Sequence, residues 1–233
     1  MAVPDGSDGG GTPAPRWVCL DIGETLIDET RIWSVWADVL AIPRFTFMAV
    51  LGGAVARGGD HRDAFALLGV HDWAAREPEV QRAYGGFDPT DLYPDALPSL
   101  AALHRAGHRL AVVGNQPASR TAELRALGVH ADVVAMSDTL GVAKPDPAFF
   151  ARCCELLASP PAAIAYVGDR VDNDVAPAAA AGMRAVWLRR GPWGLLQRDE
   201  RAAAALTVGS LSELAARIAE AWPGSGAPAR PEA

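Results

Sequence analysis

Residues 164–174 read Ile-Ala-Tyr-Val-Gly-Asp-Arg-Val-Asp-Asn-Asp, an apolar run that changes at Gly168 into a turn rich in carboxylates. A short apolar run closed by turn residues is typical of a strand buried on both faces. From Asp95 onward, such runs alternate with segments of helical spacing, which is the pattern of βαβ units. The sequence therefore predicts an α/β fold with a mostly parallel sheet covered by helices on both faces.

The alternation predicts the bounds of individual strands and helices. The predicted strands are Trp17–Asp21, Arg109–Val113, Asp132–Met136, Ile164–Val167 and Ala185–Leu188. The predicted helices between them are Ala96–Ala106, Ala118–Leu127, Pro147–Leu157 and Val175–Ala181. Gly107 and Gly128 follow two of these helices, where a helix C-terminus favours a residue of positive φ.

The interval between the first two strands has a different pattern. Apolar residues recur there with helical spacing and no strand-like run is present. We expect a helical cap over 33–88 and an α/β core over 16–32 and 89–222. Gly85 and Gly86 can form a hinge back into the core. The predicted cap helices are Trp33–Leu40, Phe45–Ala56, His61–Leu68 and Trp73–Tyr84.

Polar groups follow three of the predicted strands. Because ligands in open α/β sheets bind beyond the carboxyl ends of the strands, these groups are candidates for function. The first strand ends in Asp21-Ile-Gly-Glu-Thr25, the second in Gly114-Asn115-Gln116 and the fourth in Gly168–Asp174. An isolated lysine, Lys144, lies in a proline-bounded loop between the third and fourth strands.

In this order, the four groups resemble the four motifs of the haloacid dehalogenase superfamily. The resemblance covers Trp17–Asp21 and Tyr93–Leu188, and it is close over Gly141–Phe150 and Val167–Asp174. It implies a Rossmann-like doubly wound parallel sheet with an all-helical cap inserted after the first motif. The predicted cap helices carry no recognisable signature of a substrate.

The resemblance also implies a covalent mechanism. Asp21 would attack a phosphorus atom and form an acyl-phosphate, which water then hydrolyses. Lys144 would neutralise the developing charge. Backbone N–H groups of Gly114 and Asn115 would bind the phosphoryl oxygens.

A divalent cation is implied as well, because a phosphate dianion and a carboxylate nucleophile repel each other. Mg²⁺ suits such a site, since it is held by carboxylates, a carbonyl oxygen and water. By resemblance, its ligands would be Asp21, the backbone carbonyl of Gly23 and Asp169. Asp174 would be a further ligand, or would orient the metal-bound water and Lys144.

Two positions depart from the family pattern. Phosphatases of the family usually carry a second aspartate two residues after the nucleophile, as proton donor and acceptor, and this position is Gly23. General acid–base catalysis contributes roughly 10²- to 10⁴-fold in rate. Glu24 or Asp28 could replace it, and Gly23→Asp should raise the rate if the side chain fits. The usual hydroxyl residue of the second motif is Gly114.

The departures leave three functions open. The leading hypothesis is a phosphatase or phosphotransferase acting on a small phosphorylated molecule. The second is a catalytically impaired member that binds a phosphorylated ligand or a partner. The third is a metal-independent, dehalogenase-like hydrolase, although the dehalogenases lack the aspartate found here at Asp169. A phosphonoacetaldehyde hydrolase needs a cap lysine, and none precedes Lys144.

Composition limits the partners. The chain has 233 residues, with 28 acidic against 21 basic side chains, which disfavours nucleic acid and anionic membranes. No window approaches the roughly 18 apolar residues of a membrane span, so we expect a cytoplasmic protein, of open oligomeric state. The ends 1–15 and 223–233 are rich in Gly, Pro and Ala and are expected to be disordered. The five histidines are scattered, which favours solvent-facing or capping roles over metal ligation.

Overall fold

The computed structural model describes residues 15–198 and 203–223, so the predicted leader and most of the predicted tail lie outside the described residues. Its centre is a parallel sheet in the order β3-β2-β1-β4-β5-β6. This order is the one of classical doubly wound folds, so the predicted fold class is confirmed. The strands are β1 Trp17–Leu20, β2 Arg109–Gly114, β3 Val133–Met136, β4 Ile164–Gly168, β5 Arg184–Leu188 and β6 Leu206–Val208.

Side chains of β1 alternate between two hydrophobic layers, as the pleat of a strand requires. Val18 and Leu20 face the layer covered by α5 and α11, whereas Trp17 and Cys19 face the layer covered by α8 and α9. Burial on both faces makes the strand a continuous apolar run. The core helices are α5 Ala96–Arg105, α6 Arg120–Ala126, α7 Ser137–Leu140, α8 Pro147–Leu156, α9 Ala176–Ala180, α10 Gly191–Leu196 and α11 Leu211–Arg217.

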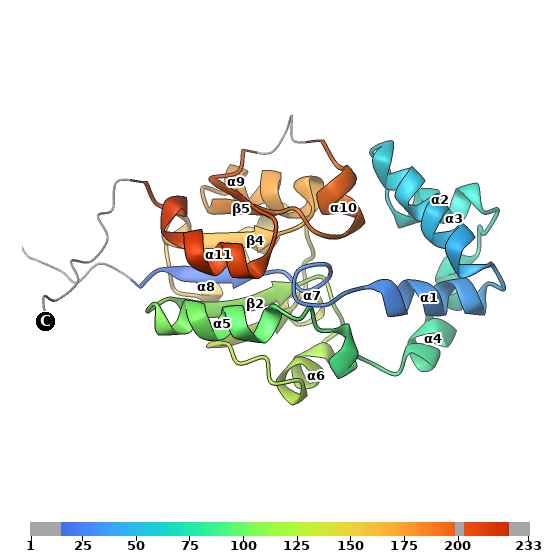
Figure 1. Cartoon of the computed structure of the whole chain (residues 1–233), viewed down its shortest axis with the longest axis horizontal. Coiled ribbons are helices and arrows are strands. Elements are labelled where there is room, and N and C mark those ends of the chain that lie inside the picture. The colour runs from blue at the N-terminus through green and yellow to red at the C-terminus, as the bar shows by residue number, and fades with distance from the viewer. Residues whose placement is uncertain (1–14, 199–202, 224–233) are drawn as a thin grey trace, which may run out of the picture.

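Four helices between β1 and β2 form a separate group beyond the end of β1 (Figure 1). They enclose their own apolar cluster, with Trp36, Phe47 and Phe65 at its centre, and Trp193 of α10 completes that cluster from the core. We call this group the cap. Its helices are α1 Thr30–Val39, α2 Arg44–Ala56, α3 His61–Leu67 and α4 Trp73–Tyr84.

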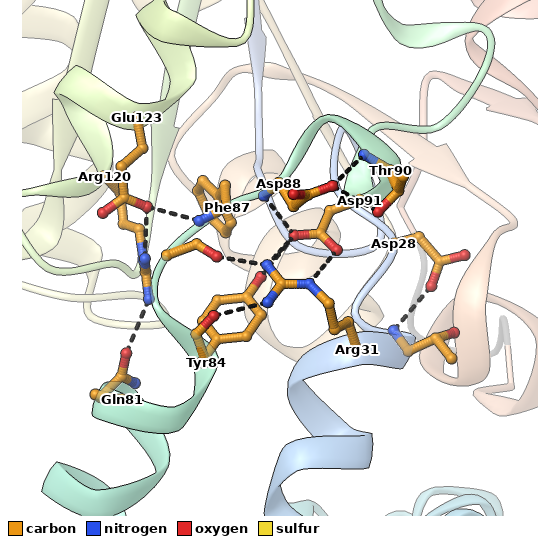
Figure 2. A network of polar contacts seen from close by, with 12 residues as sticks. Asp28, Arg31, Gln81, Tyr84, Phe87, Asp88, Thr90, Asp91, Arg120 and Glu123 are labelled. Carbon is orange, nitrogen blue, oxygen red and sulfur yellow. Dashed lines mark hydrogen bonds and ion pairs between the residues drawn. The ribbon is translucent and has the colours of Figure 1, made fainter.

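Arg31, near the start of α1, ties together the two connections between core and cap (Figure 2). Its Nε donates to Asp91 Oδ1 at 2.8 Å, and its Nη1 donates to the Tyr84 carbonyl at 2.7 Å. A further bond reaches the carbonyl of Gly86. Gly85 and Gly86 have φ of 71° and 103°, values that suit glycine at the predicted hinge.

The observed elements differ from the predicted ones mainly at short segments. The predicted cap helix Trp33–Leu40 begins earlier, at Thr30, whose N–H donates to Asp28 Oδ1 at 2.8 Å. Residues 171–175 form a π-helical turn ahead of α9, where the sequence predicted helix only from Val175. Sequence patterns missed β6, α7, α10 and α11, which have three, four, six and seven residues.

Within the described residues, no single helix is long and apolar enough to cross a membrane. Only α1 and α2 counted together reach that length and hydropathy, and a bend of 115° separates them.

Candidate active site

The carboxyl ends of β1 and β4 bring the predicted nucleophile and two further carboxylates together. The N–H of Asp21 donates to the Val167 carbonyl at 2.9 Å, which fixes the end of β1 beside the end of β4. Ligand oxygens of Asp21, Asp169 and Asp174 all lie within 4.8 Å of one another. Side chains predicted from two separate motifs therefore share one site.

Lys144 joins two of these carboxylates. Its Nζ lies 2.6 Å from Asp21 Oδ1 and 2.6 Å from Asp174 Oδ1, and its side chain is 1% exposed. Burial disfavours its positive charge, but the carboxylates of Asp174 and Asp21 together hold the pKa of Lys144 above its usual value. Lys144 thus remains an ammonium ion and is the only lysine in the sequence.

Asn115 positions the lysine through its side chain. Its Nδ2 donates to the Lys144 carbonyl at 2.9 Å, and its Oδ1 accepts the Lys144 N–H at 2.8 Å. The side chain of Asn115 therefore holds the Lys144 loop against the end of β2. Phosphate binding by the N–H groups of Asn115 and Gly114 stays a prediction.

Asp174 is fully buried, and three bonds fix it in place. Besides Lys144, its Oδ2 accepts the Arg170 N–H at 3.1 Å, and its own N–H donates to the Arg170 carbonyl at 2.9 Å. The π-helical turn 171–175 supplies this geometry. Both carboxylate oxygens are engaged, which suits an orienting residue.

Asp169 lacks such partners. It is 2% exposed, and its buried Oδ2 has no hydrogen-bond partner. Burial and then the charges of Asp174 and Asp21 raise the pKa of Asp169 well above its usual range. One ammonium among three buried carboxylates leaves negative charge uncompensated. Oxygen ligands with this excess charge fit a hard divalent cation.

No side chain fits at position 114 beside Asp21 as it stands. A Cβ on Gly114 would lie 2.6 Å from Asp21 Oδ1 and 3.1 Å from Ile22 Cδ1. The carboxylate of Asp21, held by Lys144, therefore occupies the space that the usual hydroxyl residue would need. This explains glycine there.

Position 23 is likewise filled, by a residue that sequence reasoning missed. A Cβ on Gly23 would lie 2.9 Å from Glu29 Cδ and closer still to Glu29 Oε1. The gain expected from Gly23→Asp depends on whether the side chain fits, and in this structure the added side chain and the Glu29 carboxyl would compete for one space. Glu29 directly precedes α1 and is the eighth residue after Asp21, so motif spacing gave no signal.

Glu29 has an unusual environment for a carboxyl group. Its Oε2 accepts the Trp33 Nε1–H at 3.2 Å, and its backbone N–H donates to Glu24 Oε1 at 3.0 Å. Withdrawal from water and then the charges of Glu24 and Asp21 raise the pKa of Glu29 to about 8. An ordinary glutamate has a pKa of about 4.3, so this environment strongly opposes ionisation of Glu29.

The site opens into a pocket of about 400 Å³ between core and cap. From the core come Asp21, Lys144 and Asp169, and from the start of the cap come Glu29 and Trp33. His61 also lines it. His61 is half-buried and packs 5.7 Å from Trp73 and 6.0 Å from Trp33, ring centre to ring centre, and it lies outside the trio that could hold a metal.

Comparisons with known proteins agree with this arrangement. Residues 15–182 match the haloacid dehalogenase-like hydrolase family model. A glyceraldehyde 3-phosphate phosphatase of Methanopyrus kandleri is 34% identical over 58% of this chain and 62% of its own length. A phosphoserine phosphatase of Thermus thermophilus is 37% identical over 53% of this chain and 49% of its own length. The chain thus spans about half to three fifths of these relatives.

A solved structure extends the likeness beyond that stretch. A phosphatase of this superfamily from Thermococcus onnurineus is 26% identical, with a TM-score of 0.58 over 87% of this chain and 97% of its own. A doubly wound sheet with reactive groups at its carboxyl edge is an enzyme architecture. With the family model, it shows that this chain is a hydrolase that belongs to the haloacid dehalogenase-like family.

Proposed function

We propose that this hydrolase is a Mg²⁺-dependent phosphatase that acts on a small phosphorylated molecule through an aspartyl-phosphate at Asp21. One observation carries the proposal. Asp21 lines a pocket with one oxygen fixed by Lys144, beside Asp169, whose buried oxygen lacks a partner. This combination provides an oriented nucleophile, a cation for the phosphoryl group and a place for a metal ion. The phosphatase names of the relatives support the same class of substrate.

Each residue then has a defined task. The carboxylate of Asp21 forms a bond to phosphorus while the bond from phosphorus to the leaving oxygen breaks. Lys144 keeps Asp21 in the orientation for attack, and its charge offsets the negative charge that gathers on the phosphoryl oxygens. Water next attacks the phosphorus, which releases phosphate and restores the carboxylate.

A metal ion would be held by Asp21 and Asp169, with Asp174 oriented behind them. When bound, Mg²⁺ would supply the charge that allows a phosphate dianion to approach a carboxylate. The same trio argues against the metal-independent, dehalogenase-like hydrolase. A site that works without metal has no use for a third buried carboxylate whose oxygen is unpartnered.

A phosphoester panel tests the proposal. Purified protein with Mg²⁺ should release phosphate from at least one small phosphomonoester, and EDTA should abolish the release. Asp21→Asn should retain less than a few per cent of the rate, because an amide cannot form the acyl-phosphate. Equal rates for the Asp21→Asn variant and the wild type would remove Asp21 from the mechanism. Phosphate release that persists in EDTA would remove the metal.

A further inference from the structure

We propose that Glu29 is the catalytic proton donor and acceptor of this enzyme, in place of the carboxyl group that Gly23 cannot supply. The inference rests on the proposed phosphatase function, and it names a residue that the motif pattern does not reach. Two observations carry it: the Glu29 carboxyl occupies the space of a side chain at position 23, and it lines the same pocket as Asp21.

The carboxyl group of Glu29 lies where a side chain at position 23 would begin. The position that a Cβ of residue 23 would take lies 2.9 Å from the carboxyl carbon of Glu29. An aspartate at position 23 would carry its own carboxyl carbon one bond beyond that Cβ. The two carboxyl groups would therefore compete for one region beside the nucleophile, although one is attached two residues after Asp21 and the other eight.

Trp33 holds the glutamate in this place. Its indole N–H donates to Glu29 Oε2, and the two residues are one helical turn apart at the start of α1. Trp33 itself packs against Trp193, with ring centres 6.3 Å apart. The hydrogen bond from this packed indole therefore limits the conformations of the Glu29 side chain before substrate binds.

The two acidic residues nearer in sequence have other roles. Both oxygens of Glu24 are engaged, since Oε1 accepts the Glu29 N–H and Oε2 accepts the Tyr93 hydroxyl proton at 2.5 Å. Asp28 accepts the N–H of Thr30 and lines a different pocket, with Arg31 and Thr90. Glu24 also lines the nucleophile's pocket, but Glu29 is the residue whose carboxyl group occupies the space of a side chain at position 23.

The proton balance follows from these positions. In the first step, the Glu29 carboxylic acid gives its proton to the leaving oxygen as the bond from that oxygen to phosphorus breaks, and an alcohol departs. In the second step, the Glu29 carboxylate takes a proton from the water that attacks phosphorus. Phosphate leaves, the Asp21 carboxylate returns, and Glu29 is again protonated.

Glu29→Gln separates catalysis from structure, because the amide oxygen can still accept the Trp33 N–H. With an alkyl phosphate such as glycerol phosphate, whose leaving group needs a proton, kcat should fall roughly 10²- to 10⁴-fold. With nitrophenyl phosphate, the release of nitrophenolate in the first turnover should keep its wild-type rate, since this leaving group needs little protonation. Glu77→Gln, on the exposed face of α4, is the matched control and should keep both rates.

An unchanged alkyl-phosphate rate in Glu29→Gln would overturn the assignment, and so would equal losses with both substrates, which indicate a purely structural role. A wild type without any phosphatase activity would instead reject the proposed function. A second measurement, independent of turnover, then still decides where Glu29 lies.

That measurement is a stability cycle between positions 23 and 29. Gly23→Ala should lower Tm by about 2–10 °C in the wild type, because its Cβ meets the Glu29 carboxyl. In the Glu29→Ala background the same change should cost far less. Equal losses in both backgrounds would show that Glu29 does not fill this space. If the enzyme is active, Gly23→Asp combined with Glu29→Ala should also recover alkyl-phosphate turnover that Glu29→Ala alone has lost.

Discussion

Lys144 neutralises charge at the centre of the site, and two buried carboxylates depend on it. Lys144→Ala should lower the free energy of unfolding by about 3–5 kcal/mol, because Asp21 and Asp174 would be left buried without their cation. Phosphatase activity should fall nearly as far as in Asp21→Asn, since the phosphoryl charge also loses its partner. Urea unfolding and steady-state kinetics measure the two effects. Wild-type kinetics in Lys144→Ala would show that Lys144 has a structural role only.

Replacing Asp169 should change the stability of the protein differently in the absence and in the presence of Mg²⁺. In EDTA, Asp169→Asn should be at least as stable as the wild type, because it replaces a carboxyl group whose ionisation is opposed by burial and by two neighbouring carboxylates. In the wild type, Mg²⁺ at 100 times its Kd should add about 2.7 kcal/mol of stability, and the variant should lose this gain. Thermal unfolding with and without Mg²⁺ measures both.

Asp172→Asn is the matched control for that experiment. Asp172 is exposed and paired with Arg170 at 2.7 Å, outside the carboxylate trio. It should keep the Mg²⁺-dependent rise in Tm. A rise that persists in Asp169→Asn would remove Asp169 from the metal site.

Among the elements, the links between core and cap determine how the pocket is closed. Asp91 lies on a single 3₁₀ turn, Pro89–Asp91. Its carboxylate accepts hydrogen bonds from the Arg31 guanidinium, the Tyr84 hydroxyl and the Asp88 N–H. Figure 2 shows how Arg120 of α6 extends this network through Gln81 and Glu123. The two segments that connect the core to the cap therefore meet at the ion pair between Arg31 and Asp91.

Arg31→Ala should loosen this junction. A buried Asp91 without its partner costs about 1–3 kcal/mol, and the carbonyls of Tyr84 and Gly86 lose a donor. We expect faster limited proteolysis at Gly85–Gly86 and a lower Tm. Arg44→Ala, which removes an exposed ion pair with Asp38, is the control and should leave stability nearly unchanged. Equal protease sensitivity in the two variants would contradict the role given to Arg31.

The same pair predicts a dependence on pH. Burial opposes ionisation of Asp91, but the hydrogen bonds from Arg31 hold the pKa of Asp91 below its usual value. A lowered pKa contributes stability above the unfolded value of about 4, and this contribution is lost as the pH falls through the folded value. The difference in stability between wild type and Arg31→Ala should therefore be full at pH 7 and shrink below about pH 4. A difference that grows on acidification would contradict this.

Most helices and strands were predicted from sequence, including the four-residue strands β1 and β3, whereas β6, α7, α10 and α11 were missed. Trp73–Tyr84 was predicted to the residue, because it spans several turns and ends at Gly85 with positive φ. β6 has three residues and α10 has six, so neither the alternation of a strand nor the spacing of a helix stands out in their sequences. Of the site, the strand ends located Asp21, Asp169 and Asp174, because parallel strands bring their carboxyl ends to one edge. Glu29 was missed because its place depends on the turn after β1.

In the whole molecule, one tryptophan joins two hydrophobic cores. Trp193 belongs to α10 of the α/β core, is 3% exposed, and completes the apolar cluster of the cap. Trp193→Ala should cost about 3–5 kcal/mol and leave the cap without its anchor. We expect tryptophan fluorescence to change at lower urea than circular dichroism, where the wild type shows coincident transitions.

Leu195→Ala tests whether the effect is specific to Trp193. Leu195 lies on the same short helix, but it is 59% exposed, so its loss should change stability by less than about 0.5 kcal/mol. Coincident transitions in Trp193→Ala would show that the cap and the core are coupled by other contacts.

Lys144 also makes the enzyme unusually simple to label. Because no other lysine is present, an amine-reactive reagent has a single side-chain amine to acylate besides the terminal amino group. That amine is buried between two carboxylates, so the reagent can reach it only while the pocket stands open. The rate of acylation, followed by mass spectrometry on the intact chain, therefore depends both on exposure of the site and on release of the proton that the two carboxylates hold on Lys144. A phosphorylated compound that slows acylation identifies itself as a ligand of the site without any assay of turnover.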